Sequence, residues 1–198
     1  MKLAARWNLL LAALVLAAPA LAVAPGEPVK NFQLLDQMGK PHELYGLKDS
    51  KAVVLMIQGN GCPIVRQALP ALQAIREQYA SRGVEFLLLN SNLQDTSDTI
   101  AKEAEEFSIR LPILVDNAQT VGEELGVQRT SEVFVIDPHH WTLVYRGPMD
   151  DRLHYEQQRP ATKHYLTDAL DAVIAGQPVK VKQAAGVGCI VNFPNRRQ

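Results

Sequence analysis

The sequence predicts an α/β fold in which helices cover both faces of a mixed central sheet. Three observations lead to this prediction. Apolar runs at residues 51–58 and 84–90 have the length and continuity of strands buried on both faces. An amphipathic segment separates them, and such a strand–helix–strand unit makes the two strands parallel. Further strand-like segments at residues 132–137 and 143–146 are joined by a short turn, which predicts an antiparallel hairpin.

The N-terminal segment, residues 1–22, has the pattern of a secretory signal peptide. Lys2 and Arg6 make its start positive, and an unbroken apolar run over residues 7–18 follows. That run is too short to span a bilayer comfortably. The small residues of the Ala-Leu-Ala triplet ending at Ala22 suit signal peptidase. We therefore expect cleavage near Ala22, a periplasmic or secreted protein, and no stable membrane anchor.

The remaining elements fill one predicted domain, residues 25–176, before a C-terminal tail at residues 177–198. Apolar residues at spacings of three and four predict its helices, and short apolar runs beside turn residues predict its strands. In chain order after the N-terminal leader, they are a strand at 31–36, a strand at 51–58, a helix at 63–81, a strand at 84–90, a helix at 96–107, a strand at 111–115, a helix at 120–125, the hairpin, and a helix at 161–175.

The composition argues against a nucleic-acid partner, and the histidine pattern does not predict a metal site. The chain has 20 basic and 21 acidic residues and a formal net charge of −1, and no basic block runs along it. We therefore expect no nucleic-acid partner. His139 and His140 lie together in the predicted hairpin turn, but they do not form a recognisable set of metal ligands. The sequence predicts neither a metal site nor a cofactor.

Cys62 is the candidate catalytic residue. It follows a buried strand and the Gly-Asn-Gly loop of residues 59–61, and it precedes the predicted helix that Pro63 begins. Free backbone N–H groups at a helix start stabilise an anion, so a thiol there has a lowered pKa and reacts as the thiolate. The alternative is a buried structural cysteine, but the neighbouring glycines favour an exposed loop.

Several motifs around this cysteine resemble those of the redoxins, which are thioredoxin-like proteins of the AhpC/TSA type related to peroxiredoxins. The resemblance covers roughly residues 25–175. Within the redoxins, the chain is similar to exported redoxin-domain proteins with a single cysteine at the helix start. It is carried by the Cys62 loop, Pro70 within the helix, the entry segment 23–47, the segment 126–137, the Gly-Pro-Met-Asp-Asp-Arg stretch at 147–152 and the Gly-Cys-Ile-Val stretch at 188–191.

The resemblance implies a thioredoxin-like three-layer fold and thiol chemistry. It implies a thiol-disulfide oxidoreductase or antioxidant redoxin, with Cys62 as nucleophile and a protein dithiol or disulfide, or a peroxide, as substrate. The residues expected to contact that substrate are Gly61, Pro63, Thr130 and Ser131. Arg66 and Arg129 could bring positive charge to the site, although a solvated surface position is the simpler expectation for each.

The chain departs from its relatives at three places. Thioredoxins carry a second cysteine three residues after the first, where this chain has Val65. They also place a cis-proline after a threonine, where this chain has Ser131 after Thr130, and a trans peptide or a reshaped loop is expected there. Peroxiredoxins carry a threonine where this chain has Gly59, so peroxidase activity is the less favoured function.

Cys189, in the C-terminal tail, is the second cysteine of the chain, and its role stays open at this stage. As a resolving cysteine it needs access to Cys62, which the small residues around it would permit. As a structural partner it would close a long loop and stabilise a non-catalytic binding module by about 4–5 kcal/mol in the chain-entropy model. In a third alternative the two cysteines do not meet.

Overall fold

The computed structural model describes residues 22–155 and 158–194. The signal peptide expected at residues 1–22 lies, except for Ala22, outside the described residues. The helices and strands alternate along the chain much as the sequence predicts. They are β1 (Gln33–Leu35), β2 (Pro41–Glu43), β3 (Ala52–Gln58), α1 (Pro63–Tyr79), β4 (Val84–Asn90), α2 (Ser97–Glu106), β5 (Ile113–Val115), α3 (Thr120–Leu125), β6 (Val133–Asp137), β7 (Thr142–Gly147) and α4 (Tyr165–Ile174), with short 3-10 turns at Leu44–Leu47 and Ala80–Arg82.

The central sheet has five strands in the order β5-β4-β3-β6-β7. Strands β3, β4 and β5 are parallel, whereas β6 runs antiparallel to β3 and β7 antiparallel to β6. The predicted mixed sheet is therefore confirmed. All seven residues of β3, the middle strand, are buried, as its continuous apolar run requires. Strands β1 and β2 form a separate hairpin.

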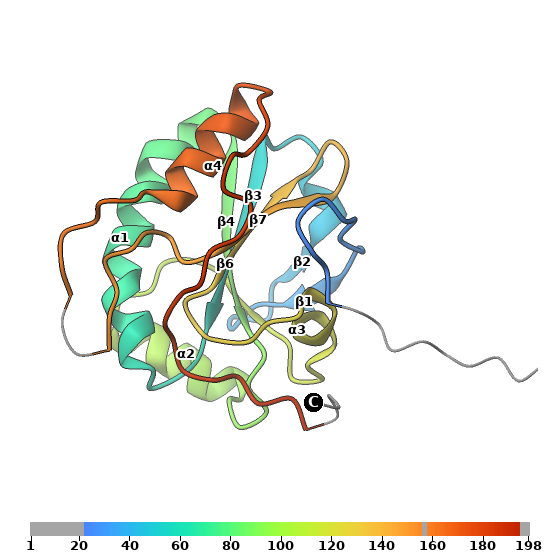
Figure 1. The fold of residues 1–198 in the computed structure, drawn as a ribbon. Coiled ribbons are helices and arrows are strands. Elements are labelled where there is room, and N and C mark those ends of the chain that lie inside the picture. Colours follow the sequence, from blue (N-terminus) through green and yellow to red (C-terminus); the bar gives the residue numbers. More distant parts are fainter. Residues whose placement is uncertain (1–21, 156–157, 195–198) are drawn as a thin grey trace, which may run out of the picture.

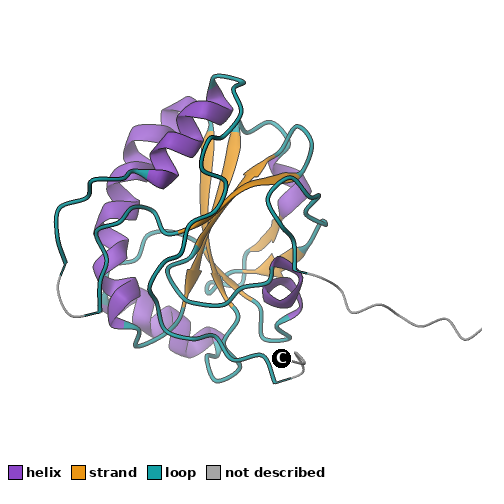
Figure 2. Cartoon of the chain, viewed as in Figure 1, coloured by secondary structure: helices purple, strands orange, loops and turns teal. Residues whose placement is uncertain are grey.

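Helices cover both faces of this sheet, which confirms the predicted three layers (Figures 1 and 2). Alternate side chains of β3 enter two separate apolar clusters. Val54 and Met56 pack with residues of α1, α2 and α4, whereas Val53 and Leu55 pack with α3 and the N-terminal hairpin region. Each such buried side chain contributes about 1.5–3 kcal/mol, so burial on both faces fixes β3 firmly in the molecule.

The last helix begins later than the sequence predicts, at Tyr165 instead of residue 161. The backbone N–H groups of Thr162 and Lys163 donate to the Asp151 carboxylate, at 2.7 and 3.0 Å. These bonds hold that segment against the preceding loop and prevent it from joining the helix. The Thr162 hydroxyl also donates to this carboxylate and is the main cause that lowers the pKa of Asp151. The two backbone N–H groups lower that pKa further.

The tail after α4 folds back over the molecule and pairs twice with the domain. It first meets β7, where the Arg146 N–H donates to the Lys182 carbonyl at 3.0 Å. Further on, Ile190 makes an antiparallel bridge with Arg129 in the loop before β6. The last described part of the tail lies against the apolar cluster on the α3 side of the sheet, where Val191 and Phe193 are buried. In residues 22–155 and 158–194, no helix has both the length and the hydropathy to cross a membrane.

Candidate active site

Cys62 lies at the N-cap of α1, directly after the turn that ends β3. The chain turns sharply at Gly61, whose φ of +72° lies in the left-handed region that favours glycine. Pro63 then occupies the first helical position, where its missing N–H costs no helical hydrogen bond. The side chain of Cys62 faces the core and the residue is only 3% exposed. The predicted helix-start position is confirmed, but the predicted exposure of the cysteine is not.

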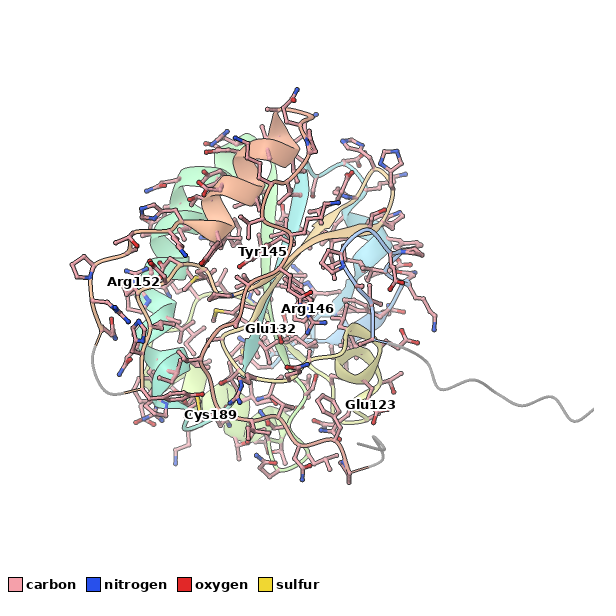
Figure 3. All side chains as sticks on the ribbon, viewed as in Figure 1. Glu123, Glu132, Tyr145, Arg146, Arg152 and Cys189 are labelled. Carbon is pink, nitrogen blue, oxygen red and sulfur yellow. A yellow bond between two sulfur atoms is a disulfide. The ribbon has the colours of Figure 1, made fainter. Side chains whose placement is uncertain are left out.

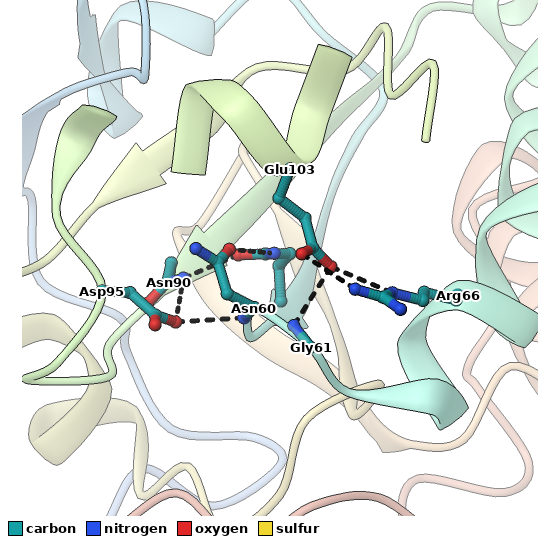
Figure 4. A network of polar contacts seen from close by, with 7 residues as sticks. Asn60, Gly61, Arg66, Asn90, Asp95 and Glu103 are labelled. Carbon is teal, nitrogen blue, oxygen red and sulfur yellow. Dashed lines mark hydrogen bonds and ion pairs between the residues drawn. The ribbon is translucent and has the colours of Figure 1, made fainter. Parts of the chain in front are cut away.

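Polar side chains below the turn fix its backbone (Figure 4). The Asn60 N–H donates to the Asp95 carboxylate at 3.0 Å, and the Asn90 side chain donates to the same oxygen at 2.8 Å. The Gln58 amide donates to the Asn60 side-chain oxygen at 3.0 Å. Asn90 and Asp95 are buried, so these bonds satisfy groups that water cannot reach. The turn carrying Cys62 is therefore held in one geometry.

Glu103 of α2 holds the other side of the same turn. One of its oxygens accepts the Gly61 N–H at 3.1 Å, and its carboxylate also pairs with Arg66 of α1, at 3.0 and 3.2 Å. The Arg66 guanidinium lies 3.8 Å from the centre of the Phe107 ring. Arg66 therefore keeps a partly exposed position, as expected, but its charge is paired with the Glu103 carboxylate.

The sulfur of Cys62 is bonded to that of Cys189, which lies on the tail (Figure 3). The two Cα atoms are 6.3 Å apart, and 127 positions of sequence separate the residues. The alternative in which the two cysteines do not meet is excluded. The structure thus brings together the two predicted catalytic residues, across a distance in the chain that the sequence alone leaves open.

Thr130 connects the two cysteines through its hydroxyl and its backbone. The hydroxyl lies 3.1 Å from Cys62 Sγ and accepts the Cys189 N–H at 2.9 Å. Because a disulfide sulfur carries no proton, the hydroxyl donates in the first of these contacts. The Thr130 N–H donates to the Cys189 carbonyl at 2.9 Å. Thr130 is 1% exposed, so these bonds form in a site closed to water.

Ser131 continues this contact with the tail. Its hydroxyl donates to the Val187 carbonyl at 2.8 Å, and its N–H donates to the Ile57 carbonyl of β3 at 2.7 Å. No peptide bond among the described residues is cis, and Ser131 has a φ of +59°. Of the two alternatives expected here, the trans peptide is confirmed. The loop faces the tail with a hydroxyl where relatives carry a proline ring.

Tyr155 and Arg129 bind the residue before Cys189. The Tyr155 hydroxyl donates to the Gly188 carbonyl at 2.9 Å and accepts the Gly188 N–H at 3.2 Å. Arg129 donates to the same carbonyl and to the Tyr155 hydroxyl, both at 3.1 Å. Arg129 is therefore not a plain solvated residue. The sequence around Tyr155 does not predict its contact with Gly188, because that contact depends on where the tail lies.

The loop that carries Thr130 is anchored by a buried ion pair. Arg146 of β7 donates to Glu132 at 2.6 and 3.0 Å and to the carbonyls of Leu125 and Gly126. Figure 3 shows the Arg146 and Glu132 side chains near each other beside the tail. Since the guanidinium also satisfies two backbone carbonyls, its removal would leave several buried acceptors without a donor. This pair fixes the loop before β6.

The four residues expected to bind substrate divide into two pairs. Gly61 and Pro63 are exposed on the α1 side, whereas Thr130 and Ser131 are buried beneath the tail. The departure at Gly59 also has a structural reason. A Cβ atom there would lie 2.7 Å from the Asn92 amide and 2.8 Å from the Thr130 methyl group. A threonine at position 59 would require the Asn92 and Thr130 side chains to shift, whereas the Thr130 hydroxyl reaches the sulfur from the opposite loop.

This arrangement can perform thiol–disulfide exchange. When the bond between the cysteines is broken, Cys62 keeps its place at the start of a long helix, beside a hydroxyl donor. Both features stabilise a thiolate. Cys189 lies on a tail segment that is held mainly by hydrogen bonds, and it is close enough to reform the bond. The Cys62 sulfur is therefore suited to be the nucleophile and the leaving group, and the Cys189 sulfur is suited to resolve a mixed disulfide.

Comparisons with known proteins agree with the fold and with this chemistry. The model of the AhpC/TSA family matches residues 25–144. A thiol-disulfide oxidoreductase ResA of Geobacillus thermodenitrificans (strain NG80-2) is 31% identical over 116 residues, 59% of this chain and 65% of that protein, so the match spans less than two thirds of its length.

Two solved structures each match most of this chain. One is a hypothetical protein from Sinorhizobium meliloti 1021, with a TM-score of 0.78, 28% identity, and coverage of 88% of this chain and 97% of that one. The other is an uncharacterized conserved protein from Geobacillus kaustophilus, with a TM-score of 0.77, 28% identity, and coverage of 92% and 100%.

Proposed function

Since the chain belongs to the AhpC/TSA family and has its thioredoxin-like fold, we propose that it is a thiol-disulfide oxidoreductase that acts through Cys62 and Cys189. The observation that carries this proposal is the bond between a cysteine at a helix start and a cysteine on a hydrogen-bonded tail. The similarity to a protein named thiol-disulfide oxidoreductase supports the same activity.

The reaction has two exchange steps. The Cys62 thiolate attacks a sulfur of the substrate disulfide, which forms a mixed disulfide and releases the first substrate thiolate. The Cys189 thiolate then attacks Cys62 Sγ, releases the second substrate thiolate and leaves the Cys62–Cys189 bond. The substrate gains two electrons, and the protein loses them. An external dithiol protein restores the reduced form by the reverse steps.

The two cysteines have different roles because their surroundings differ. The helix start and the Thr130 hydroxyl stabilise negative charge on Cys62. A stabilised thiolate is also the better leaving group in exchange. In the disulfide form, Cys189 has its backbone bonded to Thr130 on both its N–H and its carbonyl, so a docked tail places the resolving thiol against Cys62 Sγ.

The substrate class we propose is a protein disulfide or dithiol. A peroxide is a second candidate, because the Thr130 hydroxyl lies 3.1 Å from Cys62 Sγ and replaces the hydroxyl missing at Gly59. In that case the Cys62 thiolate takes one peroxide oxygen to become a sulfenic acid and the remainder leaves as an alcohol or water. Cys189 then condenses with the sulfenic acid and releases water.

We place this activity in the periplasm or outside the cell. The signal-peptide pattern of residues 1–22 supports that location. The disulfide itself also supports it, since such bonds persist in oxidising compartments and are rare in the cytosol.

One observation favours a different function, a non-catalytic binding module with a permanent disulfide. Cys62 is 3% exposed, and beyond Cys189 the tail is anchored by the buried side chains of Val191 and Phe193. A bond enclosed in this way would resist exchange and act as a staple.

Two cysteine variants decide between these functions, because each lacks the disulfide but only one lacks the nucleophile. Reduced Cys189→Ser and Cys62→Ser proteins are incubated with a disulfide substrate protein, and the products are separated on a non-reducing gel. We expect Cys189→Ser to accumulate a mixed disulfide that it cannot resolve, and Cys62→Ser to form at least 100-fold less. The wild-type protein should release reduced substrate.

Equal trapping by both variants would contradict the assigned roles. A lack of trapping by either variant, with no substrate reduction by the wild-type protein, would favour the binding module. Hydrogen peroxide added to the reduced wild-type protein tests the second substrate class, which requires the Cys62–Cys189 bond to form faster than in Thr130→Val.

A further inference from the structure

The tail segment around Cys189, residues 187–191, is held by hydrogen bonds to its backbone. Ser131 donates to the Val187 carbonyl, and Thr130 bonds both the N–H and the carbonyl of Cys189. Two residues later the Val191 N–H donates to the Gln128 carbonyl at 3.0 Å. With the antiparallel bridge between Arg129 and Ile190, these contacts add the segment as a short strand to the loop before β6.

Backbone contacts of this kind accept many sequences, but one position is restricted. The Tyr155 hydroxyl and Arg129 bind the backbone of Gly188, as described above. A Cβ atom on Gly188 would lie 2.0 Å from the Thr130 carbonyl oxygen and 2.9 Å from its carbon. Because those atoms belong to the backbone of a loop fixed by Glu132 and Arg146, they cannot easily move aside. In this register, the position before the cysteine therefore favours glycine over any residue that has a Cβ atom.

The position after the cysteine is not restricted. Ile190 is 72% exposed, so its side chain contributes little to the fit. On the upstream side, a cavity of about 450 Å³ lies between residues 128–132 and the tail at residues 183–187. The site therefore restricts the side chain at position 188 but leaves space on either side of it, and such an arrangement suits the binding of an extended chain.

We propose that residues 128–131, with Tyr155, form a recognition site for an extended Gly-Cys segment, and that the tail occupies it as an internal competitor. A partner protein's Gly-Cys segment takes the place of residues 187–190 during exchange. This inference rests on the proposed function and names the substrate feature that the same site selects. In the step involved, the Cys62 thiolate attacks the sulfur of the partner's cysteine, and that cysteine's former sulfur partner leaves as a thiolate.

The tail can vacate the site without leaving the molecule. Val191 and Phe193 remain buried beyond Cys189, and they oppose complete release. Upstream, the run of Ala184, Ala185 and Gly186 has small side chains and leaves room for the segment to swing outward. A partner therefore competes with a tethered segment. When the partner's segment lifts from the site while still bonded to Cys62, the tail returns, and the Cys189 thiolate attacks Cys62 Sγ and releases the partner's thiolate.

Two peptides that differ at one residue test the proposal. Each carries one cysteine activated as a mixed disulfide with thionitrobenzoate, preceded by glycine in one peptide and by alanine in the other. The full-length Cys189→Ala protein is used, so that Cys62 attacks without being resolved, and the release of thionitrobenzoate is followed by absorbance. The tail competes equally with both peptides, so the ratio of the rates reports the site itself.

We expect the glycine peptide to react at least tenfold faster than the alanine peptide. The activated disulfide of N-acetylcysteine is the control for the general reactivity of Cys62, and Tyr155→Phe is expected to reduce the glycine preference. Equal rates for the two peptides, with a reactive control disulfide, would overturn the recognition site and leave the proposed function intact. If Cys62 reacts with neither peptide nor the control, the proposed function itself fails and the recognition site falls with it.

Discussion

The two ends of the Cys62–Cys189 disulfide are held in place by different means. Cys62 follows a strand with seven buried residues, and side chains of Asp95 and Glu103 fix its turn. Cys189 is half-buried and lies on a tail whose described residues, up to position 194, form no helix or named strand. Hydrogen bonds between backbone groups and the loop before β6 position it. The first end cannot move without disturbing the core, whereas the second can separate by exchanging hydrogen bonds with water.

This difference indicates how a disulfide between distant residues can be reversible. A fixed end keeps the nucleophile at the helix start in every redox state. A hydrogen-bonded end can leave, since each such bond contributes only about 1 kcal/mol net when water can replace it. The predictions below change one end at a time, in order of expected effect.

Gly188→Ala should have the largest effect, because it acts on the weaker end at its tightest contact. The added Cβ would lie 2.0 Å from the Thr130 carbonyl oxygen, so the tail can no longer lie in its present register. We expect the rate of disulfide formation in the reduced protein to fall at least tenfold, measured by thiol trapping during reoxidation. Ile190→Ala, a change at an exposed neighbour, is the matched control and should reoxidise at the wild-type rate. A wild-type rate in Gly188→Ala would show that the tail docks differently.

Thr130→Val affects both ends at once while preserving the shape of the side chain. It removes the hydroxyl that donates to Cys62 and accepts the Cys189 N–H. A lost hydrogen bond of this kind costs about 1 kcal/mol net, so we expect reoxidation about fivefold slower. Thr130→Ser keeps the hydroxyl and should restore most of the rate. If Thr130→Val and Thr130→Ser behave alike, the hydroxyl has no role in exchange.

Glu103→Gln weakens the fixed end. The variant keeps an acceptor for the Gly61 N–H but loses the ion pair with Arg66, whose side chain is 36% exposed. Because water screens this partly exposed ion pair, we expect only a small loss of stability, seen as a decrease in Tm of about a few degrees at most. The exchange rate should change less than in Gly188→Ala. Thermal unfolding followed by circular dichroism measures the first effect, and a larger loss of exchange than in Gly188→Ala would reverse the comparison of the two ends.

Asp36, in the hairpin region away from the disulfide, provides a stability control. Burial raises the pKa of its carboxyl, but hydrogen bonds from His42 and from the N–H groups of Lys40 and Met38 outweigh burial and leave that pKa below its ordinary value. Stabilisation by a group with a lowered folded pKa is present above the unfolded value, about 3.9, and is lost as the pH falls through the folded value.

The difference in Tm between wild type and Asp36→Asn should therefore be largest at pH 7 and should decrease towards pH 2. Exchange through Cys62 should be unchanged by the substitution. A Tm difference that grows on acidification would contradict the assigned sign of the pKa shift.

The sequence predicts the fixed end of the site well, because that end depends on local patterns. The apolar run of β3, the glycine at position 61 and Pro63 together specify a strand, a sharp turn and a helix start. The sequence does not predict the second end. Tyr155 and Gly188 are 33 positions apart, and no periodic pattern in the sequence connects them. Their contact can be identified only from the position of the tail in the structure.

The burial of Cys62 has a similar cause. The glycines beside it favour an exposed loop, and Gly61 is indeed exposed. The tail then covers the sulfur, and no local pattern around Cys62 reports that cover. The resemblance to redoxins leaves the same question open, because the residues at positions 65 and 131 depart from the thioredoxin pattern described above.

The reduction potential of the Cys62–Cys189 pair tests the central claim most directly. The wild-type protein is equilibrated in redox buffers of known potential at pH 7, its thiols are trapped, and the oxidised fraction is measured by mass spectrometry. An exchangeable pair predicts a single two-electron transition with a midpoint between about −300 and −120 mV, the range of dithiol oxidoreductases. A bond that remains oxidised well below about −300 mV would contradict the account and identify the disulfide as structural.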